Sequence, residues 1–340
     1  MPRPLALLLV FCVSCSAPAP AAPHPVEQTR TAMGSSLRLS AWTTDETAAM
    51  AAFEQVFREF DRLESLLSVW KPGSDVVRIN EAAGRGPVVV SGDTLTVLEA
   101  AAQASEWTGG KFDITFGALA DIWKFDHDQD NTVPDQSAIA ARLPFVDYRL
   151  VQVDRAARTA FISKAGARIH LGGIGKGYAA DRAAAILRER GLRDFLIQSG
   201  GDLLVAGTNG GRPWKLGIGD PRGAAGQTFA TVEMTDGTFS TSGDYERFFI
   251  TEGVRYHHLI DPDSGSPATG TRSVTIVADT AVLADVLSTG VFILGPAEGM
   301  KLIERLPQVE GVIVSATNQV LISSGLKGRV AIAAPPTDAP

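Results

Sequence analysis

The sequence predicts an α+β fold: a single compact domain with largely antiparallel sheets and packed helices. Strand-like and helix-like segments are mixed along the chain without the regular alternation typical of a parallel α/β sheet. The chain has 340 residues, of which 45% are hydrophobic, enough to build a substantial core. It contains no internal repeat and no long linker after residue 26, so we expect one domain over residues 27–333.

The helices are predicted from apolar residues at helical spacing and from the residues at their ends. The first begins at Thr44, has Asp45 in its first turn, and carries an apolar stripe from Phe53 to Leu63. Core packing explains this stripe, and it requires no cofactor. Further helices are expected over residues 94–107, 134–144, 179–190, 281–293 and 298–305.

The strands are predicted where polar and apolar residues alternate between turn residues. Residues 28–42 form a strand pair or a bent strand around Met33-Gly34, and residues 149–162 form a hairpin broken near Ala156. Further strands are expected over residues 169–172, 195–198, 203–206, 214–218, 228–234, 272–278, 311–315 and 320–323. Residues 334–340 are expected to be a flexible tail.

Residues 1–15 have the pattern of a bacterial lipoprotein signal. Arg3 supplies positive charge, and the apolar run that follows is too short to span a bilayer. Small residues precede Cys15, the residue that would carry the lipid, although Cys12 stands where leucine is usual. Residues 16–26 form a Pro/Ala-rich tether. We expect an exported protein attached by lipid to the periplasmic face of the inner membrane or, alternatively, a soluble periplasmic protein.

The charge balance excludes one class of partner. The formal net charge is −7 and the isoelectric point is near 5.3, so a basic surface that binds nucleic acid is not expected. An acidic protein that binds an anionic phosphate must concentrate positive charge locally or use a metal ion.

The segment from Ile169 to Asp181 is the most informative one, because it has four glycines within six residues before an alanine-rich helix. Such a turn presents free N–H groups and a positive dipole end to an anion, although a plain tight turn is the alternative. The P-loop pattern fails because Gly177, rather than Ser or Thr, follows Lys176. The dinucleotide pattern fails because Tyr178 stands where a third small residue belongs.

A second segment places oxygen ligands on one face of a predicted helix. Asp285 and Thr289 are four residues apart, and Ser288 shares their face. One carboxylate with hydroxyl groups suits a hard cation such as Mg²⁺. The alternative is a buried Asp that caps a loop, with Thr bonded to its own helix.

Two other segments could contribute to a binding site. The hydroxyl-rich residues 239–247 could bond the polar edge of a ligand, and residues 109–123 could wall a flat ring or simply pack in the core. His257 and His258 would point to opposite faces of a strand, so at most one faces a given site. A single histidine is more often structural than catalytic.

Taken in order, these segments resemble the ApbE family, the FAD:protein FMN transferases, whose older label is thiamine biosynthesis lipoprotein. The motifs that carry the resemblance span nearly all of the chain after the tether: Met33-Gly34-Ser35, Leu67-Ser68-Val69-Trp70, Phe112-Asp113-Ile114-Thr115 with Trp123, residues 171–179, Gly200-Gly201-Asp202, Thr241-Ser242-Gly243, residues 258–262, and Asp285 with Ser288 and Thr289. The resemblance implies an ApbE-like, T-fold-like domain.

The resemblance also implies an activity: Mg²⁺-dependent transfer of the FMN part of FAD to a Thr or Ser hydroxyl of an acceptor protein, with release of AMP. It places Mg²⁺ on Asp285, Ser288, Thr289 and the backbone carbonyl of Gly173. It gives His258 the role of general base. The positions that match flavin or nucleotide contacts are Met33, Trp70, Lys111, Phe112, Asp113, His170, Lys176, Thr241, Ser242, Gly243 and Leu259.

His170 departs from the family pattern, because many relatives carry Asp there. It either changes a ligand contact or supports the glycine turn by hydrogen bonding. Acceptors in the family carry an Asp-x-Ser/Thr-Gly/Ala-Ala-Ser/Thr motif, as in subunits of membrane redox complexes, and this chain has no convincing copy. Two alternative functions stay open: an FAD pyrophosphatase that releases FMN and AMP, and a non-catalytic exported flavin-binding lipoprotein.

Overall fold

The main sheet of the protein has eight strands and is antiparallel throughout. The computed structural model describes residues 22–339, and the sheet order is β1-β2-β6-β7-β10-β15-β16-β17. The strands are β1 (His24–Ala32), β2 (Ser35–Thr43), β6 (Asp194–Ser199), β7 (Asp202–Ala206), β10 (Gly237–Gly243), β15 (Thr271–Ala278), β16 (Glu310–Ser315) and β17 (Val320–Ile322). The expected α+β class with largely antiparallel sheets is confirmed.

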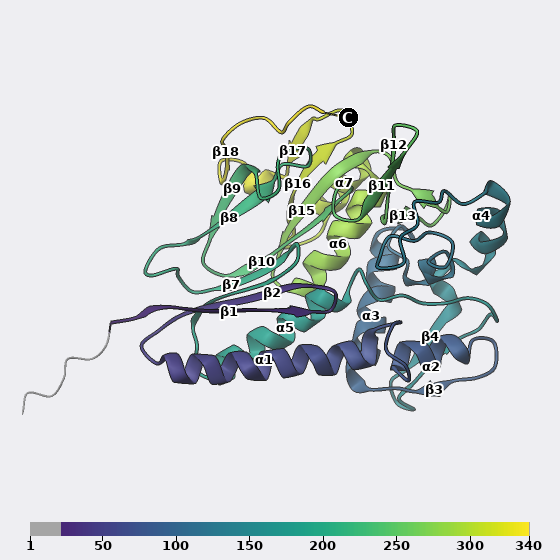
Figure 1. Ribbon diagram of the computed structural model, residues 1–340, viewed down its shortest axis with the longest axis horizontal. Coiled ribbons are helices and arrows are strands. Elements are labelled where there is room, and N and C mark those ends of the chain that lie inside the picture. The colour runs from purple at the N-terminus through teal and green to yellow at the C-terminus, as the bar shows by residue number, and fades with distance from the viewer. Residues whose placement is uncertain (1–21, 340) are drawn as a thin grey trace, which may run out of the picture.

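Helices cover one face of this sheet (Figure 1). The longer ones are α1 (Glu46–Leu67), α3 (Gly92–Trp107), α5 (Gly175–Glu189), α6 (Ala281–Leu294) and α7 (Pro296–Arg305). Helix α6 packs directly on β10 and β15, and α5 lies between α6 and α1. The predicted apolar stripe of α1 is buried in this layer, where Phe53, Phe60 and Leu63 are fully covered. The largest hydrophobic core therefore lies between the helices and the sheet.

A small sheet covers the other face. Its strands, in the order β18-β9-β8, are β18 (Val330–Ile332), β9 (Thr228–Met234) and β8 (Trp214–Gly219). Their buried residues pack on Val205, Phe239 and Val314 of the main sheet. Because successive side chains of a strand point to opposite faces, the central strands of the main sheet contribute to both cores.

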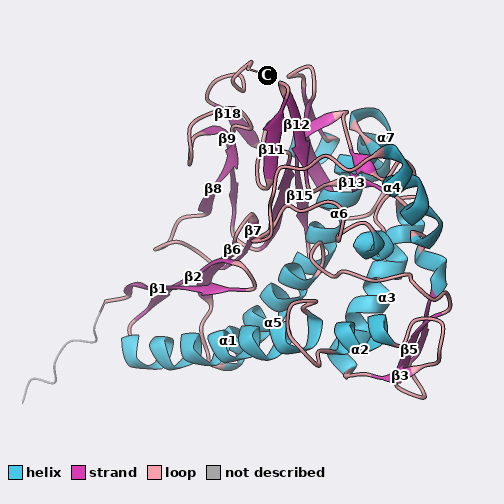
Figure 2. Cartoon of the chain, turned by 45° about the vertical axis from the view of Figure 1, so that its right-hand side comes forward, coloured by secondary structure: helices cyan, strands magenta, loops and turns pink. Residues whose placement is uncertain are grey.

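Two peripheral groups complete the domain: α2 (Asp75–Glu81) with a small sheet, at the lower right of Figure 2, and α4 (Gln136–Arg142) with two hairpins, in its upper part. The small sheet consists of β3 (Val88–Val89), β5 (Thr159–Ile162) and β4 (Val151–Asp154). The hairpins are β11 (Phe248–Thr251) with β12 (Val254–His257), and β13 (Ile260–Asp261) with β14 (Ser266–Pro267). Stacked aromatic rings of Trp123, Phe125, Phe249 and Tyr256 hold the first hairpin to the domain.

Several predicted boundaries differ from the structure. Residues 169–172 are not a strand, and α5 begins at Gly175 rather than 179, so the last two glycines of the turn belong to its first turn. Helix α2 and strand β10 were not predicted. Polar residues conceal the usual pattern in both elements. They are tolerated because Asp75 accepts the backbone N–H of Ser91 and the β10 hydroxyls form hydrogen bonds inside the protein.

The ends of the chain differ as well. Strand β1 begins at His24, within the residues expected to form the tether, because it pairs along its whole length with β2. The expected flexible tail packs on the domain over residues 336–338, where the backbone N–H and the hydroxyl of Thr337 bond Asp220. The predicted signal at 1–15 and most of the tether lie outside the described residues. Within residues 22–339, no helix has the length and apolar character needed to cross a membrane.

Candidate active site

The glycine turn and the start of α5 meet the carboxylate of α6. The backbone N–H of Gly177 donates to Oδ2 of Asp285 at 2.9 Å. A Cβ atom on Gly177 would lie 2.4 Å from the carbonyl oxygen of Ala281, so only glycine lets the two helices approach this closely. The two most informative segments of the sequence, about a hundred residues apart, therefore form one site.

Thr289 lies on the same side of α6, opposite the turn. A Cβ atom on Gly173 would lie 3.6 Å from Oγ1 of Thr289 and 3.4 Å from the Phe112 ring. Among the described residues, no hydrogen bond reaches Oδ1 of Asp285. Gly173 therefore lies beside Thr289, and Asp285 precedes Thr289 by four residues on α6. The three predicted ligands carry carbonyl, hydroxyl and carboxylate oxygens, the donor types that Mg²⁺ prefers.

Of the three predicted ligands Gly173, Asp285 and Thr289, Asp285 supplies the single carboxylate. Between residues 22 and 339, no three His, Cys, Asp or Glu side chains converge in a way that could hold a metal ion. A cation here would depend on hydroxyl and carbonyl oxygens and on the oxygens of its anionic ligand. These residues fit Mg²⁺ bound together with a phosphate better than a cation bound by protein carboxylates alone.

A hydroxyl network from β10 holds these ligands in place. Ser242 Oγ lies 2.8 Å from Ser288 Oγ and 3.3 Å from Thr289 Oγ1. Ser288 is buried and also donates to the backbone carbonyl of Asp285 at 2.9 Å. Ser288 therefore connects α6 to β10, in addition to its predicted place among the metal ligands.

Lys176 brings positive charge to the site. Its ammonium group contacts Asp202 Oδ2 at 2.8 Å, and Asp202 also accepts a hydrogen bond from Ser240. Burial opposes the charge of Lys176, but the carboxylates of Asp202 and Asp285 outweigh it and raise the pKa of Lys176. Burial and the charge of Asp202 raise the pKa of Asp285. The site therefore holds a lysine that stays protonated between two closely spaced carboxylates.

His258 lies at the base of the β11–β12 hairpin. Its backbone N–H donates to the carbonyl of Arg247 at 3.2 Å, and its Nδ1 lies 3.3 Å from the same oxygen. Burial, followed by the charge of Arg247, lowers the pKa of His258 to about 3. The imidazole is therefore neutral at physiological pH and can accept a proton, but a pKa this far below 7 makes it a weak base.

His257 has a different environment. Its Nε2 bonds the carbonyl of Ala268 at 2.8 Å, and its ring packs edge-on against Phe292. It is a buried structural residue, and the two adjacent histidines point to different sides of the chain, as the sequence indicated.

His170 stands at the entrance of the glycine turn. Its Nδ1 accepts the backbone N–H of Gly172 at 3.0 Å, and its ring packs on Phe116. Burial lowers the pKa of His170 to about 4, so this nitrogen is unprotonated and free to accept. Of the two interpretations that the sequence left open, this contact favours support of the turn by hydrogen bonding.

Ion pairs and hydrogen bonds to neighbouring segments hold residues 111–113 in place. Lys111 contacts Asp261 at 2.7 Å and Asp263 at 2.8 Å, which joins this segment to the loop after His258. Asp113 is buried and accepts the N–H groups of Thr115 and Tyr148, each at 2.7 Å. Burial raises the pKa of Asp113 to about 6. Phe112 and Leu259 are buried in the same core as the glycine turn.

The remaining predicted residues lie in turns and at strand ends. Met33 has a positive φ of 47° in the β1–β2 turn, and Trp70 is 52% exposed with its ring edge-on to His127. Thr241 and Gly243 lie on β10, where Thr241 Oγ1 bonds Thr275 Oγ1 of β15 at 2.9 Å. Within the described chain, neither Met33 nor Trp70 forms a hydrogen bond with Asp285, Ser288 or Thr289.

Sequence reasoning missed two charged residues of the site, Asp202 and Arg247. Asp202 holds Lys176, and Ser240 in turn holds Asp202. Arg247 pairs with Asp126 at 2.6 Å and lies close enough to Lys176, His170 and His258 to influence their pKa values. Asp202 follows two glycines and Arg247 ends the hydroxyl-rich segment, so both positions lay within segments that the sequence singled out.

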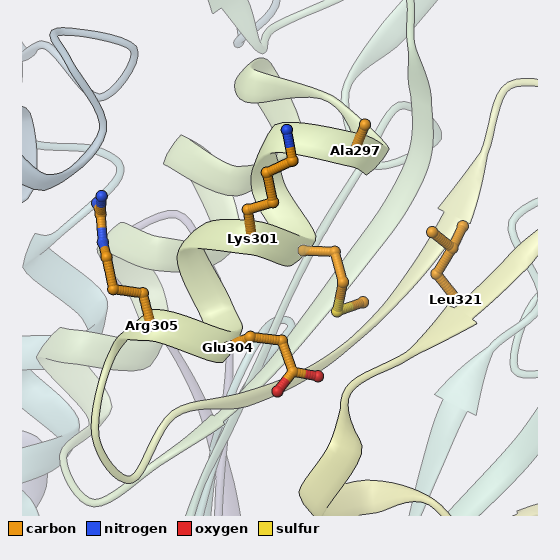
Figure 3. Close-up of a pocket in the computed structure, with 6 residues that line it drawn as sticks. Ala297, Lys301, Glu304, Arg305 and Leu321 are labelled. Carbon is orange, nitrogen blue, oxygen red and sulfur yellow. The ribbon is translucent and has the colours of Figure 1, made fainter.

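A separate hollow of about 580 Å³ lies between α7 and β17 (Figure 3). None of the predicted site residues lines it; the lining residues are Ala297, Met300, Lys301, Glu304, Arg305 and Leu321.

The fold defines a class, because this antiparallel α+β domain is shared with ApbE flavin transferases of known structure. The ApbE protein of Thermotoga maritima superposes with a TM-score of 0.83 at 32% identity, covering 90% of this chain and 99% of that one. The flavin transferase ApbE of Vibrio cholerae gives a TM-score of 0.81 at 25% identity, with the same coverage.

Sequence comparison narrows this class to a family. Residues 33–313 match the model of the ApbE family, and this chain belongs to that family. An FAD:protein FMN transferase of Klebsiella pneumoniae (strain 342) is 35% identical over 305 residues, covering 88% of this chain and 87% of the relative. One of Treponema pallidum is 34% identical over 297 residues, covering 83% and 82%.

Proposed function

We propose that this protein is an FAD:protein FMN transferase, which attaches the FMN part of FAD to a Ser or Thr hydroxyl of an acceptor protein. The observation that carries the proposal is the contact between the glycine turn and α6, where Gly177 bonds Asp285 and Gly173 faces Thr289. The names of the relatives support the same activity. Family membership therefore supports this reaction, and the contact between the glycine turn and α6 provides a place for it.

The reaction replaces the phosphoanhydride bond of FAD by a phosphoester bond to the acceptor. The acceptor oxygen attacks the phosphorus on the FMN side of the diphosphate, and the bond from that phosphorus to the bridging oxygen breaks. AMP leaves with the bridging oxygen, and the hydroxyl proton passes to a base. In such transfers the protein mainly positions the groups and neutralises charge.

The residues of this chain can fill these roles. Asp285, Thr289 and the carbonyl of Gly173 would hold Mg²⁺, with Ser288 beside them, and the bound ion would neutralise charge on the diphosphate. Lys176 adds a fixed positive charge close to Asp285. His258, neutral because burial lowers its pKa, accepts the proton of the hydroxyl.

The proposals for the acceptor protein and for the cellular location of this protein rest on the sequence rather than on the fold. We infer an acceptor with the Asp-x-Ser/Thr-Gly/Ala-Ala-Ser/Thr motif, such as a subunit of a membrane redox complex. The signal-like residues 1–15, with Cys15 as lipid site, support attachment to the periplasmic face of the inner membrane. Metabolic labelling with a fatty acid, compared between the wild type and Cys15→Ser, would test the anchor.

Mass spectrometry tests the proposed activity directly. The purified protein is incubated with FAD, Mg²⁺ and a carrier protein that bears the acceptor motif. We expect the carrier to gain the mass of FMN less one water, with one AMP released per transfer. If AMP is released from FAD while the carrier stays unmodified, the protein is instead an FAD pyrophosphatase. If no AMP is released at all, the protein is a flavin-binding protein.

A further inference from the structure

The β11–β12 hairpin projects from the wall of the active site and ends in an exposed apolar tip. Its base carries Arg247 and His258, which are joined by the hydrogen bond from the His258 N–H to the Arg247 carbonyl. Its tip is defined here as residues 250–255. The tip begins three residues from Arg247 on one strand and three residues from His258 on the other. At about 3.3 Å per residue, the tip lies roughly 10 Å from the base.

Both faces of the hairpin are packed at the base and open at the tip. Phe249 and Tyr256 pair across the strands and stack in the aromatic cluster, while His257 on the other face packs on Phe292. Beyond these pairs, Ile250 is 58% exposed and Val254 is 51% exposed. Ile250 pairs with Arg255 and Val254 with Thr251, so the two apolar side chains lie on opposite faces of the hairpin. Ile250 is therefore the exposed apolar side chain on the face that carries Arg255.

The tip is a tight turn. Thr251 pairs with Val254, and the two residues between them, Glu252 and Gly253, have φ values of 53° and 78°. Positive φ at both positions defines a type I′ turn, which fits the twist of a two-stranded hairpin. Among the described residues, no third strand pairs with β11 or β12, so their outer edges can accept an extended chain.

Arg255 forms no ion pair among residues 22–339, and the carboxylate of Asp244 only partly opposes the lowering of its pKa by burial. It lies opposite Ile250, and its guanidinium group stacks over the Phe248 ring at 4.0 Å. Two of its nitrogens are buried and have no hydrogen-bond partner. The neighbouring arginines are neutralised, Arg222 by a two-point contact with Asp244 and Arg272 by Asp338. In a protein with a net charge of −7, this unpaired charge favours a partner carboxylate.

We propose that residues 250–255 dock the acceptor protein, as an extended segment that places an apolar side chain against Ile250 and a carboxylate near Arg255. The inference rests on the proposed transferase function, because the acceptor must deliver a hydroxyl to His258 at the base of the same hairpin. A segment of about three extended residues spans the distance from tip to base. Docking at the tip thus orients the acceptor chain toward the reacting phosphorus.

The test compares the steady-state kinetics of FMN transfer to the motif-bearing carrier protein. We expect Ile250→Ser to raise the KM for the carrier about tenfold with kcat and FAD affinity little changed, because the tip binds only the acceptor. Val89→Ser is the matched control, since Val89 is 64% exposed on β3 and should leave KM unchanged. Thermal unfolding verifies that both variants are folded.

Reversing the charge of Arg255 tests whether a carboxylate of the acceptor binds there. Arg255→Glu should raise the KM at least as much as Ile250→Ser, and changing one acidic residue of the acceptor segment to Lys should restore much of the loss. A KM within twofold of the wild type for both Ile250→Ser and Arg255→Glu would overturn the docking proposal while leaving the transferase function intact. A wild-type protein that modifies no carrier at all would overturn both.

Discussion

Gly177 and Asp285 form the contact on which the active site is built: the backbone N–H of one donates to the carboxylate of the other at 2.9 Å. This hydrogen bond joins the first turn of α5 to the middle of α6, and the absence of a side chain on Gly177 makes it possible. A helix N-terminus favours negative charge, so the position also stabilises the buried carboxylate.

Gly177→Ala should disrupt this contact. The added Cβ would lie 2.4 Å from a backbone oxygen and 2.7 Å from Cβ of Asp285, so the two helices must separate. We expect the free energy of unfolding to fall by about 1–3 kcal/mol, with a large loss of transfer activity. Gly175→Ala provides the control, because a Cβ at Gly175 meets open space. Equal stability of the two variants would contradict the packing argument.

Asp285→Asn should separate metal binding from folding. The side chain keeps its shape, and its carbonyl oxygen can still accept from Gly177, but the negative charge is lost. We expect transfer to fall at least about 100-fold. We also expect that Mg²⁺ with FAD raises the melting temperature of the wild type and not that of the variant. A variant that binds Mg²⁺ normally would remove Asp285 from the ligand set.

His258→Asn should lower the catalytic rate, whereas His257→Asn should lower the stability of the fold. Loss of the base at 258 should lower kcat by about 10²-fold or more with little change in stability. Loss of the buried ring at 257 should instead lower the free energy of unfolding by about 1–3 kcal/mol, because its bond to Ala268 and its contact with Phe292 are lost. If both variants lose only stability, His258 is not the base.

The stability of the protein should depend on His170 below neutral pH. Burial lowers the pKa of His170 from 6.5 to about 4, so between these values the unfolded chain binds a proton that the folded chain does not. This contribution to stability is complete above pH 6.5 and decreases as the pH falls toward 4, by at most about 3 kcal/mol.

His170→Asn provides the measurement, because Asn can also accept from the backbone N–H two residues on but does not titrate. The difference in unfolding free energy between wild type and variant, measured from pH 4 to pH 8, should shift in favour of the variant as the pH falls. Groups such as Asp113, whose burial raises its pKa to about 6, act in the opposite direction but cancel in this difference. A pH-independent difference would show that His170 is accessible to protons in the folded state.

The sequence by itself determined the α+β class, most of the elements and the two segments that form the site. Helical spacing identified α1 and α6, and strand patterns identified β6, β7, β15 and β16, because both patterns record which side chains a core must bury. The glycine cluster and the Asp285–Thr289 spacing marked positions where a backbone approach and a shared helix face were needed.

Only the tertiary structure decided which of these groups meet. The pairing of Lys176 with Asp202 and the bond from Gly177 to Asp285 join residues far apart in the chain, and no local pattern encodes such distances. Strand β10 was missed because its hydroxyl groups are satisfied inside the protein, which hides the usual alternation. The neutral state of His258 likewise depends on burial and on Arg247, a neighbour that only folding brings close.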